Sequence, residues 1–116
     1  MTKVLLSSIL FVVFVYGCGG SHENSVSLRI PSCIDSLVKA AKGNQDGNGP
    51  QSITKYQYEG QMVYYVVAPC CDQYNTVYDG QCKPLGSPDG GITGKGDGTL
   101  QNFFTEASDK TVIWEK

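Results

Sequence analysis

One segment of the chain repeats apolar residues at i, i+3, i+4 and i+7, which is the spacing of a single helix face. These residues are Ile34, Leu37, Val38 and Ala41. Ser32 stands at the N-cap position with Asp35 three residues later, as in a capping box, and Gly43 offers a left-handed C-cap. The pattern predicts a helix over residues 32–43, followed by a polar loop over residues 43–51.

Two later segments alternate apolar and polar residues at the period of a β-strand. Residues 53–59 and 62–68 are rich in Tyr and Val, and they flank the tight turn sequence Glu59-Gly60. A two-residue connection places one set of side chains on a shared face, which we expect to cover the core. This set is Tyr56, Tyr58, Val63, Tyr65 and Val67.

The second half of the chain predicts shorter elements. Residues 76–83 form a second hairpin around Asp79-Gly80, which is a strong turn signal. Residues 84–98 contain two prolines and six glycines and predict a long loop. A short amphipathic helix over residues 100–107 and a strand over residues 111–115 follow. The fold class is therefore α+β, with a small antiparallel sheet and two short helices packed on one face.

The N-terminus has the parts of an export signal. A lysine precedes an apolar run over residues 4–15, and this run is shorter than the roughly 20 residues that cross a bilayer. Val15-Tyr16-Gly17-Cys18 resembles the bacterial lipobox, although Tyr16 stands where a small residue is more usual. We expect residues 1–17 to be removed as a lipoprotein signal peptide and Cys18 to carry the lipid.

The chain that remains divides into a tether and one domain. Residues 18–30 are mostly small and polar, which predicts a lipidated flexible tether. Residues 31–116 have the length of a single small domain. We expect an exported protein that is held in the cell envelope by its lipid anchor, on the periplasmic face of the outer membrane.

Composition argues against two classes of function. Once Lys3 leaves with the leader, eight of the nine Lys and Arg residues stand against eleven Asp and Glu, a formal charge of −3 without a basic cluster. This charge argues against a nucleic acid partner. The one histidine, His22, lies in the tether, so a Ser or Cys hydrolase lacks its base and we expect no catalytic residue.

Four cysteines remain in the domain, which is the number for two disulfides in a small exported protein. They are Cys33, Cys70, Cys71 and Cys82. A bridge between Cys70 and Cys71 would close a strained ring across one peptide bond, so we expect each to reach Cys33 or Cys82. Strand alternation favours Cys71 with Cys33 and Cys70 with Cys82. The spacing fits neither a zinc site nor a Cys-x-x-Cys redox motif.

The glycine-rich loop is the segment that we expect to bind a partner, because long loops without secondary structure are more often functional. Its candidate residues are Asp89, Gly90, Gly91, Gly94, Lys95, Gly96 and Asp97. Asp89 and Asp97 could also supply oxygen ligands to calcium, which is the only cofactor that the sequence suggests. A surface loop held by its own backbone is the simpler interpretation of the same residues.

Two motifs carry a resemblance to a known family. Cys70-Cys71-Asp72-Gln73-Tyr74 and the segment Pro88 to Gly98, with Phe103-Phe104 and Ile113-Trp114-Glu115, are similar to small uncharacterised lipoproteins found chiefly in Bacteroidota. The resemblance covers roughly residues 31–116. It implies an envelope location and an α+β domain of unknown function, and it implies no activity or substrate.

The sequence thus favours a non-catalytic binding module in the envelope. Its partner would be an envelope protein, a peptide or a glycan, bound through the glycine-rich loop and exposed tyrosines. The alternative is a calcium-dependent enzyme or enzyme accessory that uses the loop carboxylates.

Overall fold

The computed structural model describes residue 17, residues 29–44 and residues 46–116. Residues 1–16 of the predicted signal peptide, Cys18 and most of the predicted tether lie outside these described residues. Within them, no helix is long and apolar enough to cross a membrane.

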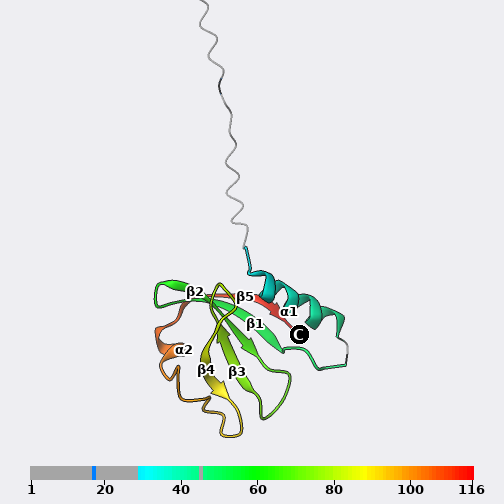
Figure 1. The fold of residues 1–116 in the computed structure, drawn as a ribbon, viewed down its shortest axis with the longest axis vertical. Helices are drawn as coiled ribbons and strands as arrows, with labels where there is room; N and C mark the ends of the chain where they lie inside the picture. The colour runs from blue at the N-terminus through cyan, green and yellow to red at the C-terminus, as the bar shows by residue number, and fades with distance from the viewer. Residues whose placement is uncertain (1–16, 18–28, 45) are drawn as a thin grey trace, which may run out of the picture.

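The described chain forms one five-stranded antiparallel sheet in the order β4-β3-β2-β1-β5, with two helices (Figure 1). The elements are α1 (Ser32–Gly43), β1 (Ser52–Tyr58), β2 (Gln61–Val67), β3 (Tyr74–Tyr78), β4 (Pro84–Gly90), α2 (Phe103–Glu106) and β5 (Ser108–Glu115). The predicted α+β class with hairpins, a C-terminal strand and two short helices is confirmed.

The first hairpin has the predicted register. Tyr58 pairs with Gln61 across Glu59 and Gly60, whose φ angles of 49° and 77° are both left-handed. Two left-handed residues give a turn whose twist matches that of the flanking strands. The tight turn Glu59-Gly60 therefore fixes which side chains of β1 and β2 share a face.

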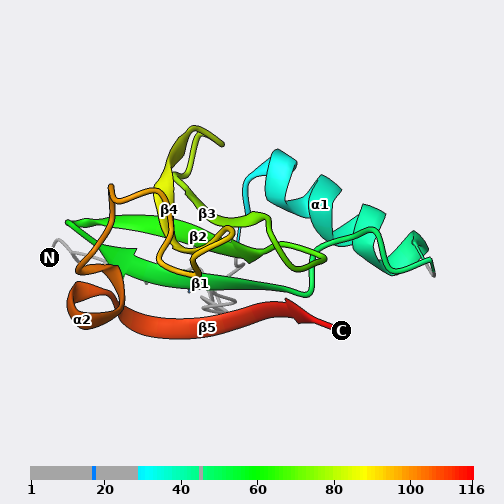
Figure 2. The ribbon, with the colours of Figure 1, turned by 90° about the horizontal axis from the view of Figure 1, so that it is seen from below.

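The two helices lie on opposite faces of the sheet, not on one face as predicted (Figure 2). The face with α2 buries Tyr58, Val63, Tyr65 and Val77 around Phe103. The other face buries Ile53 and Tyr64 against Ile34 and Val38 of α1. Both faces of β1 and β2 carry large apolar side chains, so each face needs its own cover.

The second hairpin is wider than predicted. Tyr78 pairs with Pro84, so the connection spans residues 79–83 and is not a two-residue turn. The Asp79 carboxylate accepts hydrogen bonds from the backbone N–H groups of Gln81 and Lys83, both at 2.9 Å. Because these hydrogen bonds satisfy two backbone N–H groups of the loop, they favour the longer connection.

The first part of the predicted loop is strand β4. It lies at the edge of the sheet and β3 is the only strand that it pairs with, so the missing N–H groups of its prolines are tolerated. Pro84 is its first residue, and Pro88 lies where the pairing register shifts between Asn75 and Val77. Only the residues after Gly90 form a loop, before the single turn of α2.

The bounds of α1 are as predicted, but its ends differ from the prediction. The N-cap position is Pro31, without a side-chain hydrogen bond, and Ser32 lies inside the helix. At the other end Gly43 does not take a left-handed φ, and Asn44 follows with a φ of −100°. Packing of the apolar face against the sheet, more than capping, therefore stabilises this helix.

The predicted disulfide pairing is wrong. Cys33 is bonded to Cys82, with Cα atoms 6.1 Å apart, and Cys70 is bonded to its neighbour Cys71. The strand order explains this result, because the β3–β4 connection that carries Cys82 lies at one end of the sheet beside the start of α1. The β2–β3 connection that carries Cys70 and Cys71 lies at the other end, so these two cysteines pair with each other.

Candidate functional site

The glycine-rich loop after β4 is folded back onto that strand by backbone hydrogen bonds. The Gly96 N–H donates to the Gly90 carbonyl at 3.0 Å, and the Asp97 N–H donates to the Ser87 carbonyl at 3.0 Å. Within residues 90–98, five glycines have φ between 71° and 84°, namely Gly90, Gly91, Gly94, Gly96 and Gly98. The backbone conformation of this segment therefore requires glycine at these positions, because other residues rarely adopt left-handed φ angles.

Asp89 of the predicted binding loop is a structural residue at the end of β4. The Tyr65 hydroxyl donates to its two carboxylate oxygens at 2.9 Å, and the Asn75 side-chain amide donates at 3.0 Å. Burial, followed by the contact with Asp89, raises the pKa of Tyr65. Asn75 in turn accepts the Ala68 N–H at 2.8 Å. The carboxylate therefore holds β2, β3 and β4 together.

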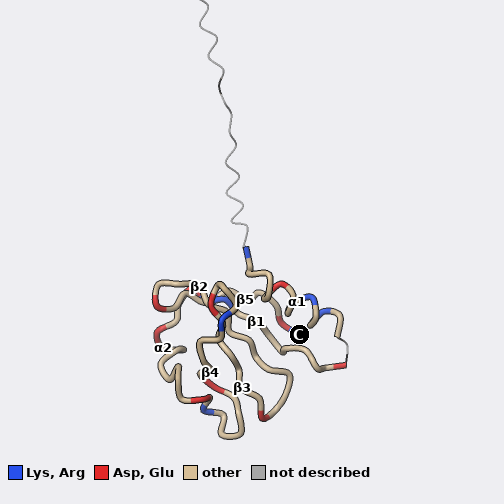
Figure 3. Tube along the Cα trace, viewed as in Figure 1, with Lys and Arg blue, Asp and Glu red and all other residues tan. Residues whose placement is uncertain are grey.

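The other charged residues of the loop, Lys95 and Asp97, are exposed. Asp97 accepts hydrogen bonds from the hydroxyl and the backbone N–H of Thr99, and these bonds lower the pKa of its carboxyl. Among residues 17, 29–44 and 46–116, no group of three His, Cys, Asp or Glu side chains could hold a metal ion. Charged residues are scattered along the described trace (Figure 3).

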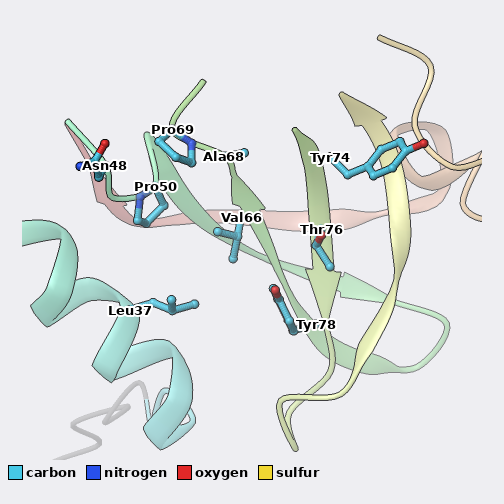
Figure 4. Close-up of a pocket in the computed structure, with 9 residues that line it drawn as sticks. All are labelled: Leu37, Asn48, Pro50, Val66, Ala68, Pro69, Tyr74, Thr76 and Tyr78. Carbon is cyan, nitrogen blue, oxygen red and sulfur yellow. The ribbon is translucent and has the colours of Figure 1, made fainter. Parts of the chain in front are cut away.

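A depression of about 210 Å³ lies between α1 and β3, on the face that α1 covers only in part (Figure 4). Its residues come from α1, from the loop before β1, and from strands β2 and β3 with the segment that joins them. They are Leu37, Asn48, Pro50, Val66, Ala68, Pro69, Tyr74, Thr76 and Tyr78. Tyr74, Thr76 and Tyr78 alternate along β3, so their side chains share the floor of the depression.

Two further depressions extend the first. One, of about 450 Å³, shares Leu37 and Tyr78 with it and reaches the Cys33–Cys82 bridge. The other, of about 410 Å³, shares Tyr74. It is lined by Asp72, Tyr74, Gly91, Ile92 and Thr93. We call the three together the α1–β3 groove.

The groove is apolar, with a carboxylate at one end. Its lining combines aliphatic and aromatic side chains with the polar side chains of Ser36, Asn48, Thr76 and Thr93. Asp72 is its one charged lining residue among the described residues. Tyr74 is 54% exposed and Ile92 is 88% exposed, although both are large apolar side chains. Two such side chains next to each other beside a depression are typical of a surface that contacts a partner.

The glycine-rich loop contributes to the groove through Gly91. A Cβ atom on this residue would lie 2.6 Å from the Cε1 atom of Tyr74, so only glycine allows the Tyr74 ring its position. The Gly91 N–H also donates to the Gln73 carbonyl at 2.9 Å. The loop that the sequence singled out therefore positions the aromatic side chain at the centre of the groove.

Comparison with protein families identifies residues 39–116 as a domain of unknown function, DUF6970. The chain belongs to the DUF6970 family. The matched segment contains all five strands, α2 and both motifs singled out in the sequence. Searches of curated proteins and of solved structures found no significant match.

The DUF6970 segment contains most of the groove, but sequence reasoning missed its central residues. The predicted hairpin starts at residue 76, so Tyr74 is assigned to no strand from the sequence, whereas β3 starts at Tyr74. A signal was present, since Tyr74, Thr76 and Tyr78 repeat at the period of a strand. Leu37 carried no such signal, because its exposure beside β3 depends on where α1 crosses the sheet.

Proposed function

We propose that this chain is an exported lipoprotein whose folded domain is a non-catalytic binding module. Three features of the sequence support the anchor: the short apolar leader, the lipobox-like Val15-Tyr16-Gly17-Cys18, and a resemblance to small Bacteroidota lipoproteins. The anchor makes the membrane itself a partner. The periplasmic face of the outer membrane is the proposed location.

The α1–β3 groove is the proposed binding surface, and its occupant is an extended segment of another envelope protein. Tyr74 and Tyr78 are four residues apart on one strand, so the floor alone is about 13 Å long at about 3.3 Å per residue. This length fits about four residues of an extended peptide. The three depressions then accept apolar side chains, and Asp72 at one end pairs with a Lys or Arg.

The chemistry of the lining favours a peptide over a glycan. A bound glycan needs many hydrogen-bonding groups for its hydroxyls, whereas this lining is mainly Leu, Val, Ala, Pro, Ile and Tyr. The calcium-dependent alternative gains no support, because the Asp89 carboxylate already accepts hydrogen bonds from Tyr65 and Asn75. The single observation that carries the proposal is the half-exposed Tyr74 between two depressions.

A display library of random peptides tests the proposal with the full chain as bait. We expect enrichment of peptides with alternating apolar residues and one Lys or Arg. Tyr74→Ala should weaken an enriched peptide at least tenfold, about 1.4 kcal/mol. Phe104→Ala is the matched control, because Phe104 is 51% exposed but lies on α2, and it should leave the affinity unchanged.

The proposal fails if no peptide family is enriched, or if both variants weaken binding equally. Binding of envelope glycans by the wild type, with loss in Tyr74→Ala, would assign the groove to glycans. A heat of calcium binding that disappears in both Asp89→Asn and Asp97→Asn would favour the calcium-dependent alternative.

A further inference from the structure

We propose that the Cys70–Cys71 bridge is a thiol–disulfide exchange site that accepts electrons from a dithiol, and that its redox state controls the adjoining end of the α1–β3 groove. The exchange itself does not depend on the proposed function, whereas the control of the groove rests on it. The four cysteines form two bridges with different surroundings.

The Cys70–Cys71 bridge is open to solvent. Both cysteines are exposed, whereas Cys33 and Cys82 are partly buried. Cys33 also packs against the apolar cluster between α1 and the sheet. An attacking thiolate must approach a sulfur directly, so access favours the bridge between Cys70 and Cys71.

The two bridges also differ in what they do for folding. Cys33 and Cys82 are 49 residues apart, so their bridge restricts a long loop of the unfolded chain. Cys70 and Cys71 are adjacent, so their bridge removes almost no loop entropy. The domain can therefore lose the second bridge and stay folded, which a reversible exchange site requires.

The backbone around the adjacent pair is held at both ends and strained between them. The Ala68 N–H donates to the Asn75 side chain at 2.8 Å, and the Gly91 N–H donates to the Gln73 carbonyl at 2.9 Å. Between these anchors Cys71 has a φ of 25°, in a region that non-glycine residues rarely adopt. Opening the bridge frees Cys71 to relax while strands β2 and β3 remain paired.

The same segment forms the wall of the groove. Pro69 precedes the pair and lines the central depression, and Asp72 follows it and lines the next one. Tyr74 lies two residues further on and lines both. A change in the backbone at Cys71 is therefore transmitted to the side chains that would contact a bound peptide.

The reaction is a two-step exchange in which electrons and protons balance. A thiolate of the dithiol attacks one sulfur of the pair, the Cys70–Cys71 bond breaks, and a mixed disulfide forms while the second sulfur leaves as a thiolate. The second thiol of the reductant then displaces the first cysteine. The reductant is oxidised to its own disulfide, and Cys70 and Cys71 are left as two thiols after gaining two electrons and two protons.

The neighbouring carboxylate gives this site a preference among reductants. Asp72 follows the pair directly and is exposed, so it repels an anionic thiol more than a neutral one. We expect Asp72→Asn to accelerate reduction by an anionic thiol several-fold and reduction by a neutral dithiol less, since the attacking thiolate itself carries a negative charge in both cases. High salt should remove the difference.

The test titrates the oxidised full chain in detergent with a neutral dithiol, followed by alkylation and peptide mass spectrometry. The alkylating reagent should label Cys70 and Cys71 together at a dithiol concentration at least tenfold below the concentration needed to label Cys33 and Cys82. The circular dichroism spectrum should be unchanged at that lower concentration. A Cys70→Ser/Cys71→Ser variant should keep its melting temperature, which a structural bridge would not allow.

The exchange proposal is overturned if Cys33 and Cys82 open first or together with the adjacent pair, or if the protein from an oxidising compartment carries Cys70 and Cys71 as free thiols. The affinity of a peptide selected on the oxidised chain supplies the second readout. It should fall at least threefold on selective reduction. An unchanged affinity, with selective reduction observed, overturns the control of the groove alone.

Discussion

At the scale of single residues, Asp89 links three strands. Replacing it with Ala removes the acceptor for Tyr65 and Asn75 and leaves both donors partly buried without a partner. We predict a loss of about 1–3 kcal/mol in the free energy of unfolding, measured by urea denaturation. Lys95→Ala, a change of an exposed side chain in the same region, should stay within about 0.5 kcal/mol of the wild type.

The glycines of the loop differ in what surrounds them. A Cβ atom on Gly96 would overlap the Ser87 carbonyl oxygen and lie 2.7 Å from the Pro88 carbonyl carbon, with φ at 71°. Gly94 has a φ of 72° but open space around it. In thermal unfolding, Gly94→Ala should cost about 1 kcal/mol from backbone strain alone, and Gly96→Ala clearly more. Equal losses of stability in the two variants would show that Gly96 does not contact β4.

The sequence predicted the conformation of these glycines better than their role. Their number in a short loop already implied positive φ, because other residues avoid that region. The contact between Gly91 and the Tyr74 ring depends on a strand pairing across the sheet, and local patterns carry no information about it. For the same reason the sequence presented Asp89 as a free carboxylate.

At the scale of elements, α2 is a single turn with one buried side chain, Phe103. Phe103 is fully buried, and its ring makes edge contacts with Tyr56 and Tyr58 at centroid distances of 5.3 Å and 5.1 Å. Phe103→Ala should cost about 3–5 kcal/mol in urea denaturation. Phe104→Ala, at the half-exposed neighbour, should cost less than half of that. A small loss in the free energy of unfolding of Phe103→Ala would contradict the packing of α2 against the core.

Strands with strong alternation were predicted from the sequence, and β4 was not. The segments around Glu59-Gly60 alternate cleanly, and their register followed from the turn. In β4, Pro84, Pro88 and Gly86 hide the pattern, because an edge strand tolerates residues that a central strand excludes. The prediction that both helices pack on one face was wrong, because alternation gives two sets of side chains and does not say which helix covers each set.

At the scale of the whole molecule, buried tyrosines should make the fold sensitive to alkali. Burial raises the pKa of Tyr64 and Tyr65 above 10.0, so their neutral forms are favoured in the folded state. The stability that this provides is fully present below pH 10 and is lost as the pH rises through the folded-state values. Thermal unfolding from pH 7 to pH 12 should show this decline, and Tyr65→Phe should make it shallower. An identical decline of stability with pH in Tyr65→Phe would contradict a contribution of Tyr65 to the alkaline sensitivity.

The anchor is tested at the same scale by Cys18→Ser. This change removes the sulfur that would carry the lipid, so the protein should move to the soluble periplasmic fraction or remain as an uncleaved precursor. Detergent partitioning and immunoblotting measure both outcomes. A variant that still partitions into detergent with the mobility of the mature protein would contradict lipidation.

An NMR titration of the ¹⁵N-labelled full chain with a library-selected peptide shows whether an extended apolar peptide binds in the α1–β3 groove. We expect the largest chemical-shift changes at Leu37, Val66, Tyr74 and Tyr78, and we expect Tyr74→Ala to abolish them. Shifts centred on α2 and the opposite face of the sheet, with the groove amides unmoved, would contradict binding in the groove.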